Sequence, residues 1–89
     1  MNRSELNQIL LTEGFYPFSY DLNGGPAPEA HILENRGYEW AVYYSERGDH
    51  VAEEVFFSES EACEFFLDRM RSDPSTRPRA ERPPLPPSF

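Results

Sequence analysis

The spacing of hydrophobic positions predicts a helix near the start of the chain. Ser4 is a suitable N-cap, because its hydroxyl can accept hydrogen bonds from backbone N–H groups two or three residues on. Gly14 is a suitable stop at the other end. Between them, the apolar residues that share one helical face are Leu6, Ile9 and Leu10. We therefore expect a helix over residues 4–13.

Residues 38–57 hold the only Trp and a dense aromatic run, and they predict two strands joined by a glycine turn. Residues 38–44 alternate in character with a period of two. The more apolar face consists of Tyr38, Trp40, Val42 and Tyr44, and the other face of Glu39, Ala41 and Tyr43. We expect the Trp40 face to be the core.

A first strand is predicted over residues 29–34, where apolar and polar residues alternate weakly. Residues 35–37 form the turn, because Gly37 can take the positive φ of a three-residue hairpin loop. In antiparallel pairing, that loop length places Ile32 opposite Trp40, with Ala30 opposite Val42.

The third predicted strand, residues 50–57, follows a similar turn at residues 46–48, and its register is open. A three-residue loop puts Glu54 opposite Trp40 and would bury a carboxylate. A shift of one residue pairs Val55 with Trp40, and it also gives the apolar pairs Val51 with Tyr44 and Phe57 with Tyr38. We favour a β-bulge near Glu53 and Glu54, which satisfies both the turn and the core.

The second predicted helix, residues 59–71, has the clearest signals in the chain. Ser58 and Glu61 have the spacing of a capping box, in which each side chain serves the other's backbone N–H. A broad apolar stripe follows, made of Ala62, Cys63, Phe65, Phe66, Leu67 and Met70. Glutamates near its start and arginines near its end suit the helix dipole.

These elements together predict an α+β fold. It consists of a three-stranded antiparallel sheet (a β-meander) with an N-terminal and a C-terminal helix on one face, in the order α-β-β-β-α. The prolines and glycines of residues 15–28 predict no long regular element there. Residues 1–71 form the single predicted domain, and residues 72–89, rich in Pro and Arg, predict a disordered tail.

Charge is distributed unevenly over the 89 residues, whose net charge is −8. Residues 1–68 contain 14 acidic and 3 basic residues, whereas residues 69–89 contain 2 acidic and 5 basic residues. An acidic folded part repels nucleic acid and attracts a basic partner; plain solubility is the alternative interpretation. The longest apolar run has three residues, so we expect no signal peptide and no membrane span. With one cysteine, Cys63, the sequence predicts a cytoplasmic protein.

The sequence shows no pattern typical of catalysis. His31, His50 and Cys63 have no metal-ligand spacing, and Cys63 belongs to the apolar stripe of the second helix. We therefore expect no metal, no cofactor and no enzymatic activity. If both helices cover the Trp40 face, the opposite face exposes His31, Glu39, Ala41, Tyr43 and one of Glu53 or Glu54. Such a face has a composition typical of protein binding, or of an ordinary solvated sheet.

Two short motifs stand out, YYSERG at residues 43–48 and SESEACEFF at residues 58–66. They resemble a pattern found in small bacterial immunity proteins that neutralise polymorphic toxins. LNGG at residues 22–25 and residues 30–33 fit the same pattern, and the resemblance covers residues 18–69 without the tail. It carries over to Tyr44, Ser45, Glu46, Arg47 and Gly48, of which Gly48 serves the turn.

The resemblance implies a stoichiometric inhibitor that occludes the catalytic cleft of a cognate secreted toxin, a cleft that is often basic. We expect neither nucleic acid nor membrane as partner, and a monomer or weak dimer when free. The expected contact residues are Tyr43, Tyr44, Glu46, Arg47, Asp49, Glu53 and Glu54. The alternative function is a small adaptor that recruits a partner through the overlapping PxxP patterns of residues 82–87.

Overall fold

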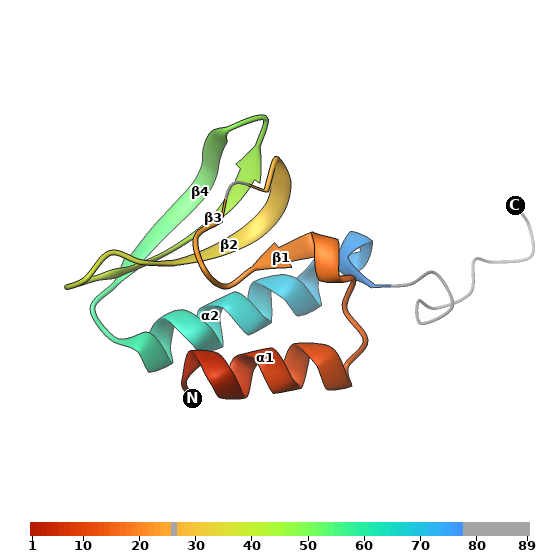
Figure 1. Ribbon diagram of the computed structural model, residues 1–89, viewed down its shortest axis with the longest axis horizontal. Helices are drawn as coiled ribbons and strands as arrows, with labels where there is room; N and C mark the ends of the chain where they lie inside the picture. Colours follow the sequence, from red (N-terminus) through yellow and green to blue (C-terminus); the bar gives the residue numbers. More distant parts are fainter. Residues whose placement is uncertain (26, 78–89) are drawn as a thin grey trace, which may run out of the picture.

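The computed structural model describes residues 1–25 and 27–77 of the chain, and they form an α+β fold (Figure 1). In order, the elements are α1 (Arg3–Thr12), η1 (Pro17–Ser19), β1 (Tyr20–Asp21), β2 (Glu29–Asn35), β3 (Trp40–Glu46), β4 (Asp49–Phe56), α2 (Glu59–Ser72) and η2 (Pro74–Thr76). The α+β class and the helix-first order agree with the sequence prediction.

The sheet has four strands in the order β1-β2-β3-β4, not the three predicted. β1 runs parallel to β2, while the other neighbours are antiparallel, so the sheet is mixed. β1 contains only two residues, which is too short to show an alternating pattern in the sequence.

Both helices lie on one side of the sheet, as predicted, and α2 contacts β2, β3 and β4. Figure 1 shows α1 on the far side of α2 from the strands. The buried cluster between these layers contains Leu6, Leu10, Phe15, Leu22, Leu33, Val42, Ala62, Cys63, Phe66, Leu67 and Met70. No helix within residues 1–25 and 27–77 has the length and apolar character that a membrane span requires.

Both helix starts depend on a side-chain cap. α1 begins at Asn2 and not at Ser4, because Asn2 and Glu5 form a capping box that the sequence analysis missed. Gly14 follows α1 with φ +76°, as expected for a glycine after a helix. At α2, the Ser58 hydroxyl accepts a hydrogen bond from the Glu61 N–H at 3.3 Å, which is one half of the predicted capping box; the return bond from the Ser58 N–H to the Glu61 carboxylate is not formed.

The predicted register between β2 and β3 is wrong, and the observed pairing turns the β2 side chains to the opposite face of the sheet. Trp40 lies opposite Asn35 and Val42 opposite Leu33, so Leu33, and not Ile32, faces the helices. The cause is the loop, which has four residues (36–39) closed by a hydrogen bond from Arg36 N–H to the Glu39 carbonyl. The extra loop residue reverses the face of every β2 side chain.

The β3–β4 hairpin turns through two residues, Arg47 and Gly48, with φ of +54° and +88°. Positive φ at both positions is typical of a type I′ turn, which suits the twist of a two-residue hairpin. The predicted pair of Val51 with Tyr44 is confirmed.

The predicted pairing near Trp40 is wrong. Phe56 lies opposite Trp40, and Val55 lies opposite Ala41 on the other face. The strand ends at Phe56, so Phe57 does not pair with Tyr38. The register shifts between Val42 and Tyr44, which leaves Ala52 and Glu53 opposite Tyr43. The β-bulge expected near Glu53 and Glu54 is therefore present, and it involves Ala52 and Glu53.

The residues that follow α2 are held against the fold, although the sequence interpretation ended the domain at residue 71. The Thr76 carbonyl accepts a hydrogen bond from the Tyr16 N–H at 2.8 Å, and Thr76 is 1% exposed. The Arg77 guanidinium lies over the Phe15 ring and 2.6 Å from a Glu13 carboxylate oxygen. The rest of the expected disordered tail, residues 78–89, lies outside the described residues.

Candidate functional site

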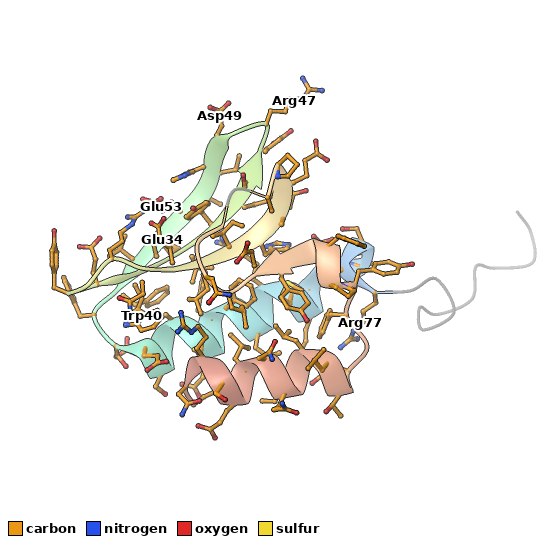
Figure 2. The ribbon with its side chains drawn as sticks, viewed as in Figure 1. Glu34, Trp40, Arg47, Asp49, Glu53 and Arg77 are labelled. Carbon is orange, nitrogen blue, oxygen red and sulfur yellow. The ribbon has the colours of Figure 1, made fainter. Side chains whose placement is uncertain are left out.

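The β3–β4 hairpin extends beyond the helical layer and ends in charged side chains (Figures 1 and 2). Glu46, Arg47 and Asp49 are exposed at its tip, and Figure 2 shows Arg47 and Asp49 directed away from the rest of the fold. β4 is the edge strand of the sheet, and all its residues from Asp49 to Val55 are exposed. The hairpin therefore has two surfaces that a partner could contact, the charged turn at its tip and the exposed edge strand β4.

Tyr43 lies on the sheet face away from the helices, but this face is not the open surface that the sequence predicted. Tyr43 is only 4% exposed and forms a small second core with Ala30, Ile32 and Ala41. Ala27 packs against this cluster, and the His50 ring stacks on the Tyr43 ring at 3.7 Å between centroids. Tyr43 is therefore buried beneath the His50 ring, and His50 is the residue exposed on this face.

An ion cluster surrounds the Tyr43–His50 stack. Arg36 lies between the carboxylates of Glu34 and Glu53, with an Arg36 Nη2 to Glu53 Oε1 distance of 3.0 Å. The same Glu53 oxygen lies 2.9 Å from Nδ1 of His50. Figure 2 shows Glu34 and Glu53 close together on this face. The cluster joins the β2–β3 loop, β2 and β4 across the sheet.

The charges in the cluster stabilise one another. Hydrogen bonds from Arg36 and, to a smaller extent, His50 lower the pKa of Glu53 below its ordinary value of 4.5. Hydrogen bonds to Glu53 and Glu34 raise the pKa of Arg36 in turn. Glu53 is therefore ionised at neutral pH and held in one position.

Two of the seven predicted contact residues lie on the opposite face. Glu54 lies opposite Val42, which belongs to the helix-side core, and its charge acts on Arg69 of α2. The Tyr44 ring meets the His31 ring edge-on, with 5.0 Å between centroids. The alternative left open by the register is thus resolved: Glu53 shares the face of Tyr43, and Glu54 does not.

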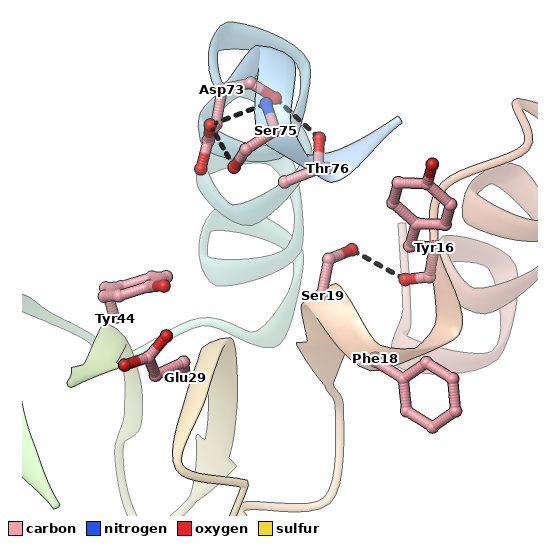
Figure 3. Close-up of a pocket in the computed structure, with 8 residues that line it drawn as sticks. All are labelled: Tyr16, Phe18, Ser19, Glu29, Tyr44, Asp73, Ser75 and Thr76. Atoms are coloured by element: carbon pink, nitrogen blue, oxygen red, sulfur yellow. Dashed lines mark hydrogen bonds between the residues drawn. The ribbon is translucent and has the colours of Figure 1, made fainter. Parts of the chain in front are cut away.

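Sequence reasoning missed a hollow of about 330 Å³, which opens where β2, β3, the segment after α1 and the segment after α2 meet (Figure 3). Its lining combines three aromatic residues with polar groups: Tyr16, Phe18, Ser19, Glu29, Tyr44, Asp73, Ser75 and Thr76. The aromatic residues of the segment after α1 were the available signal, but the sequence interpretation assigned them to holding that segment on the core.

His31, expected on the outer face, lies behind this hollow and is 5% exposed. Its Nε2 is 2.9 Å from Oδ2 of Asp73, whose other oxygen accepts from the Ser75 N–H and hydroxyl. Burial raises the pKa of Asp73, but the hydrogen bonds from His31 and Ser75 outweigh burial and leave that pKa below 3.8.

The described residues offer little to nucleophilic or metal chemistry. Burial, followed by the nearby Glu59 carboxylate, raises the pKa of the Cys63 thiol to about 11, so the thiol is protonated at neutral pH. Within residues 1–25 and 27–77, no group of three or more His, Cys, Asp or Glu side chains is placed to hold a metal ion.

Comparison with protein-family models found no matching family, and comparisons with curated proteins and with solved structures found no match either.

Proposed function

We propose that this protein is an immunity protein, which binds a cognate secreted toxin domain through the β3–β4 hairpin and occludes its catalytic cleft. The observation that carries the proposal is the hairpin itself, which projects from the fold with an acidic tip that the packing of the domain does not use. The motifs YYSERG and SESEACEFF support the same class by resemblance. The inhibition requires no chemistry from this chain.

Charge favours a basic partner. The hairpin carries four carboxylates, those of Glu46, Asp49, Glu53 and Glu54, against one arginine, Arg47. Glu46 and Asp49 form no ion pair within the described part of the chain, so both charges are available to a partner. Complementary charge speeds association and suppresses wrong partners, and the effect weakens as salt increases.

Preorganisation favours tight binding. The ion pairs with Arg36 and His50 fix Glu53 before any partner arrives, and Tyr43 supports His50 from below. A side chain that is already ordered loses less conformational entropy when it binds, and the saving is about 0.5–1.5 kcal/mol for each side chain.

The proposal expects a secreted toxin domain to be encoded beside this gene. The test is co-expression with that domain, followed by calorimetric titration of the two purified proteins. The wild-type chain protects cells and forms a 1:1 complex. The double reversal Glu46→Arg with Asp49→Arg lowers the affinity at least 100-fold, because two attractive charges become repulsive. If the wild-type chain neither binds nor protects, the proposed function is wrong.

A matched control separates the hairpin from overall charge. Glu64 and Asp68 are exposed on α2, and the double variant Glu64→Arg with Asp68→Arg changes the net charge by the same amount. This control keeps its affinity within about threefold at physiological salt, where screening confines charge effects to about 8 Å. An equal loss in both variants would mean that total charge, and not the hairpin, governs binding.

A further inference from the structure

The hollow in Figure 3 has the composition of a groove for an extended proline-rich segment. Three aromatic side chains line it, those of Tyr16, Phe18 and Tyr44. Phe18 is 89% exposed and Tyr16 is 41% exposed, which leaves much of both rings uncovered within the described structure. Aromatic-lined grooves bind proline-rich segments in the polyproline II conformation, because that conformation loses little entropy on binding.

The walls of this aromatic groove are negatively charged. Glu29 and Asp73 both line it. Burial raises the pKa of the Tyr44 hydroxyl, and the negative charges of Glu29, Asp73 and Glu46 raise it further. The groove therefore suits a segment that combines prolines with arginines.

The chain carries such a segment immediately after the groove. Residues 78–89, PRAERPPLPPSF, contain five of the nine prolines together with Arg79 and Arg82. Thr76, two residues before this segment, lines the groove and is anchored by hydrogen bonds from its hydroxyl to the Met70 and Asp73 carbonyls. Twelve residues in the polyproline II conformation reach about 37 Å at 3.1 Å per residue.

We propose that the aromatic groove binds residues 78–89 of the same chain, with prolines against Phe18 and Tyr44 and an arginine toward Glu29 and Asp73. Attachment at Arg77 gives the segment an effective concentration in the millimolar range. A site whose dissociation constant for the free peptide is 100 µM is then about nine-tenths occupied. Tyr44 is the one groove residue that belongs to the hairpin, and its ring lies against His31, on the face opposite Tyr43. The interaction does not depend on the proposed function.

Paramagnetic relaxation in the full-length protein tests the proposal. A nitroxide label is attached to Ser88→Cys, while the buried, protonated Cys63 thiol does not react; an unsubstituted sample confirms this. The label broadens the backbone amides of Phe18, Glu29 and Tyr44 at least twofold more than those of the β2–β3 loop, residues 36–39, which lies at the other end of the β2–β3 pair. The broadening does not change when the protein is diluted tenfold, because the contact is intramolecular.

Two aromatic variants identify the groove. Phe18→Ala reduces the broadening at Glu29 and Tyr44 by half or more. Phe57→Ala is the matched control, because Phe57 is 84% exposed but follows the end of β4 that is distant from the hairpin turn and from the groove. This variant leaves the broadening unchanged. Glu29→Gln removes one negative charge from the groove wall at another exposed position. This variant also reduces the broadening, which tests the contribution of charge separately from that of the aromatic rings.

Three results would overturn the proposal. Broadening confined to residues 73–77 would mean that the segment does not reach the groove. Broadening that falls on dilution would assign the contact to a second copy of the chain. Equal effects of Phe18→Ala and Phe57→Ala would show that the label approaches aromatic side chains without preference. None of these results bears on toxin binding, which the hairpin variants measure.

Discussion

His31 on β2 and Asp73 after α2 form a buried-to-surface pair, with Nε2 of His31 2.9 Å from Oδ2 of Asp73. Asp73 lines the aromatic groove, and the pair connects the sheet to the segment that carries Thr76. Phe66 of α2 also contacts the His31 ring edge-on, so the imidazole lies between α2 and β3. This pair therefore adds a contact with the sheet to the hydrogen bonds that Thr76 and Arg77 make with the segment after α1.

Asp73→Ala removes this contact and leaves a buried imidazole nitrogen without its carboxylate. Because a buried polar group that loses its partner costs about 1–3 kcal/mol, we expect the free energy of unfolding to fall by about 2 kcal/mol. Urea denaturation followed by Trp40 fluorescence measures the change. Asp68→Ala, one turn earlier on the exposed face of α2, is the control and changes stability by less than about 0.5 kcal/mol. Equal stabilities of the two variants would contradict a structural role for the pair.

Ala52→Gly stabilises the protein. Ala52 has φ +53°, a left-handed conformation that costs an L-residue with a Cβ about 1–2 kcal/mol and costs glycine almost nothing. Part of the gain is lost because glycine has more conformational freedom in the unfolded chain. We expect an increase of about 0.5–1 kcal/mol in the free energy of unfolding. Ala62→Gly, inside α2, is the opposite control and destabilises the protein. A destabilising Ala52→Gly would contradict the bulge geometry.

The elements with strong local signals were predictable from the sequence. α2 follows from the Ser58 cap and an apolar stripe of six residues between Ala62 and Met70. Five of the six are buried in the structure, and both signals depend only on neighbours in the chain. The choice of Trp40 and Val42 for the helix-facing side is also confirmed. These predictions require only the spacing of apolar residues and a capping residue at the helix start, and no knowledge of contacts between distant residues.

The register could not be read in the same way. Whether the β2–β3 loop has three or four residues decides if Ile32 or Leu33 faces the helices, and both side chains are apolar enough for either face. Both are in fact fully buried, because a second small core on the outer face accepts Ile32. The aromatic groove was missed for a related reason: it joins residues as distant as Tyr16 and Asp73, which no local pattern connects.

Low pH weakens the ion pairs that join the end of α1 to the end of α2. Arg71 and Arg77 both bind the Glu13 carboxylate, and the hydrogen bond from Arg71 lowers the pKa of Glu13 below 4.5. A carboxyl group whose pKa is lowered by folding contributes stability above its unfolded pKa, and that contribution is lost as the pH falls through the folded value. We therefore expect the stability of the wild-type protein to decrease below about pH 4.5.

Glu13→Gln isolates this contribution. At pH 7 the variant loses less than about 1 kcal/mol of stability, because exposed ion pairs contribute little. Its stability falls less steeply than that of the wild type between pH 4.5 and pH 3, so the difference between the two proteins shrinks as the pH is lowered. Chemical denaturation at several pH values measures both curves. A difference that grows toward low pH would contradict the assignment.

Arg47 separates the demands of folding from those of binding. It occupies the first position of a two-residue turn at φ +54°, where Asn is favoured over other L-residues, and its side chain makes no ion pair within residues 1–25 and 27–77. Arg47→Asn is expected to raise the free energy of unfolding by up to about 1 kcal/mol and, at the same time, to weaken toxin binding if the hairpin tip is the contact surface. Gly48→Ala is the paired control: its Cβ would meet no atom within 4 Å, so its cost of about 1 kcal/mol comes from the φ of +88° alone. Thermal unfolding and calorimetric titration of both variants measure the two effects, and an Arg47→Asn protein that is less stable would contradict the turn geometry.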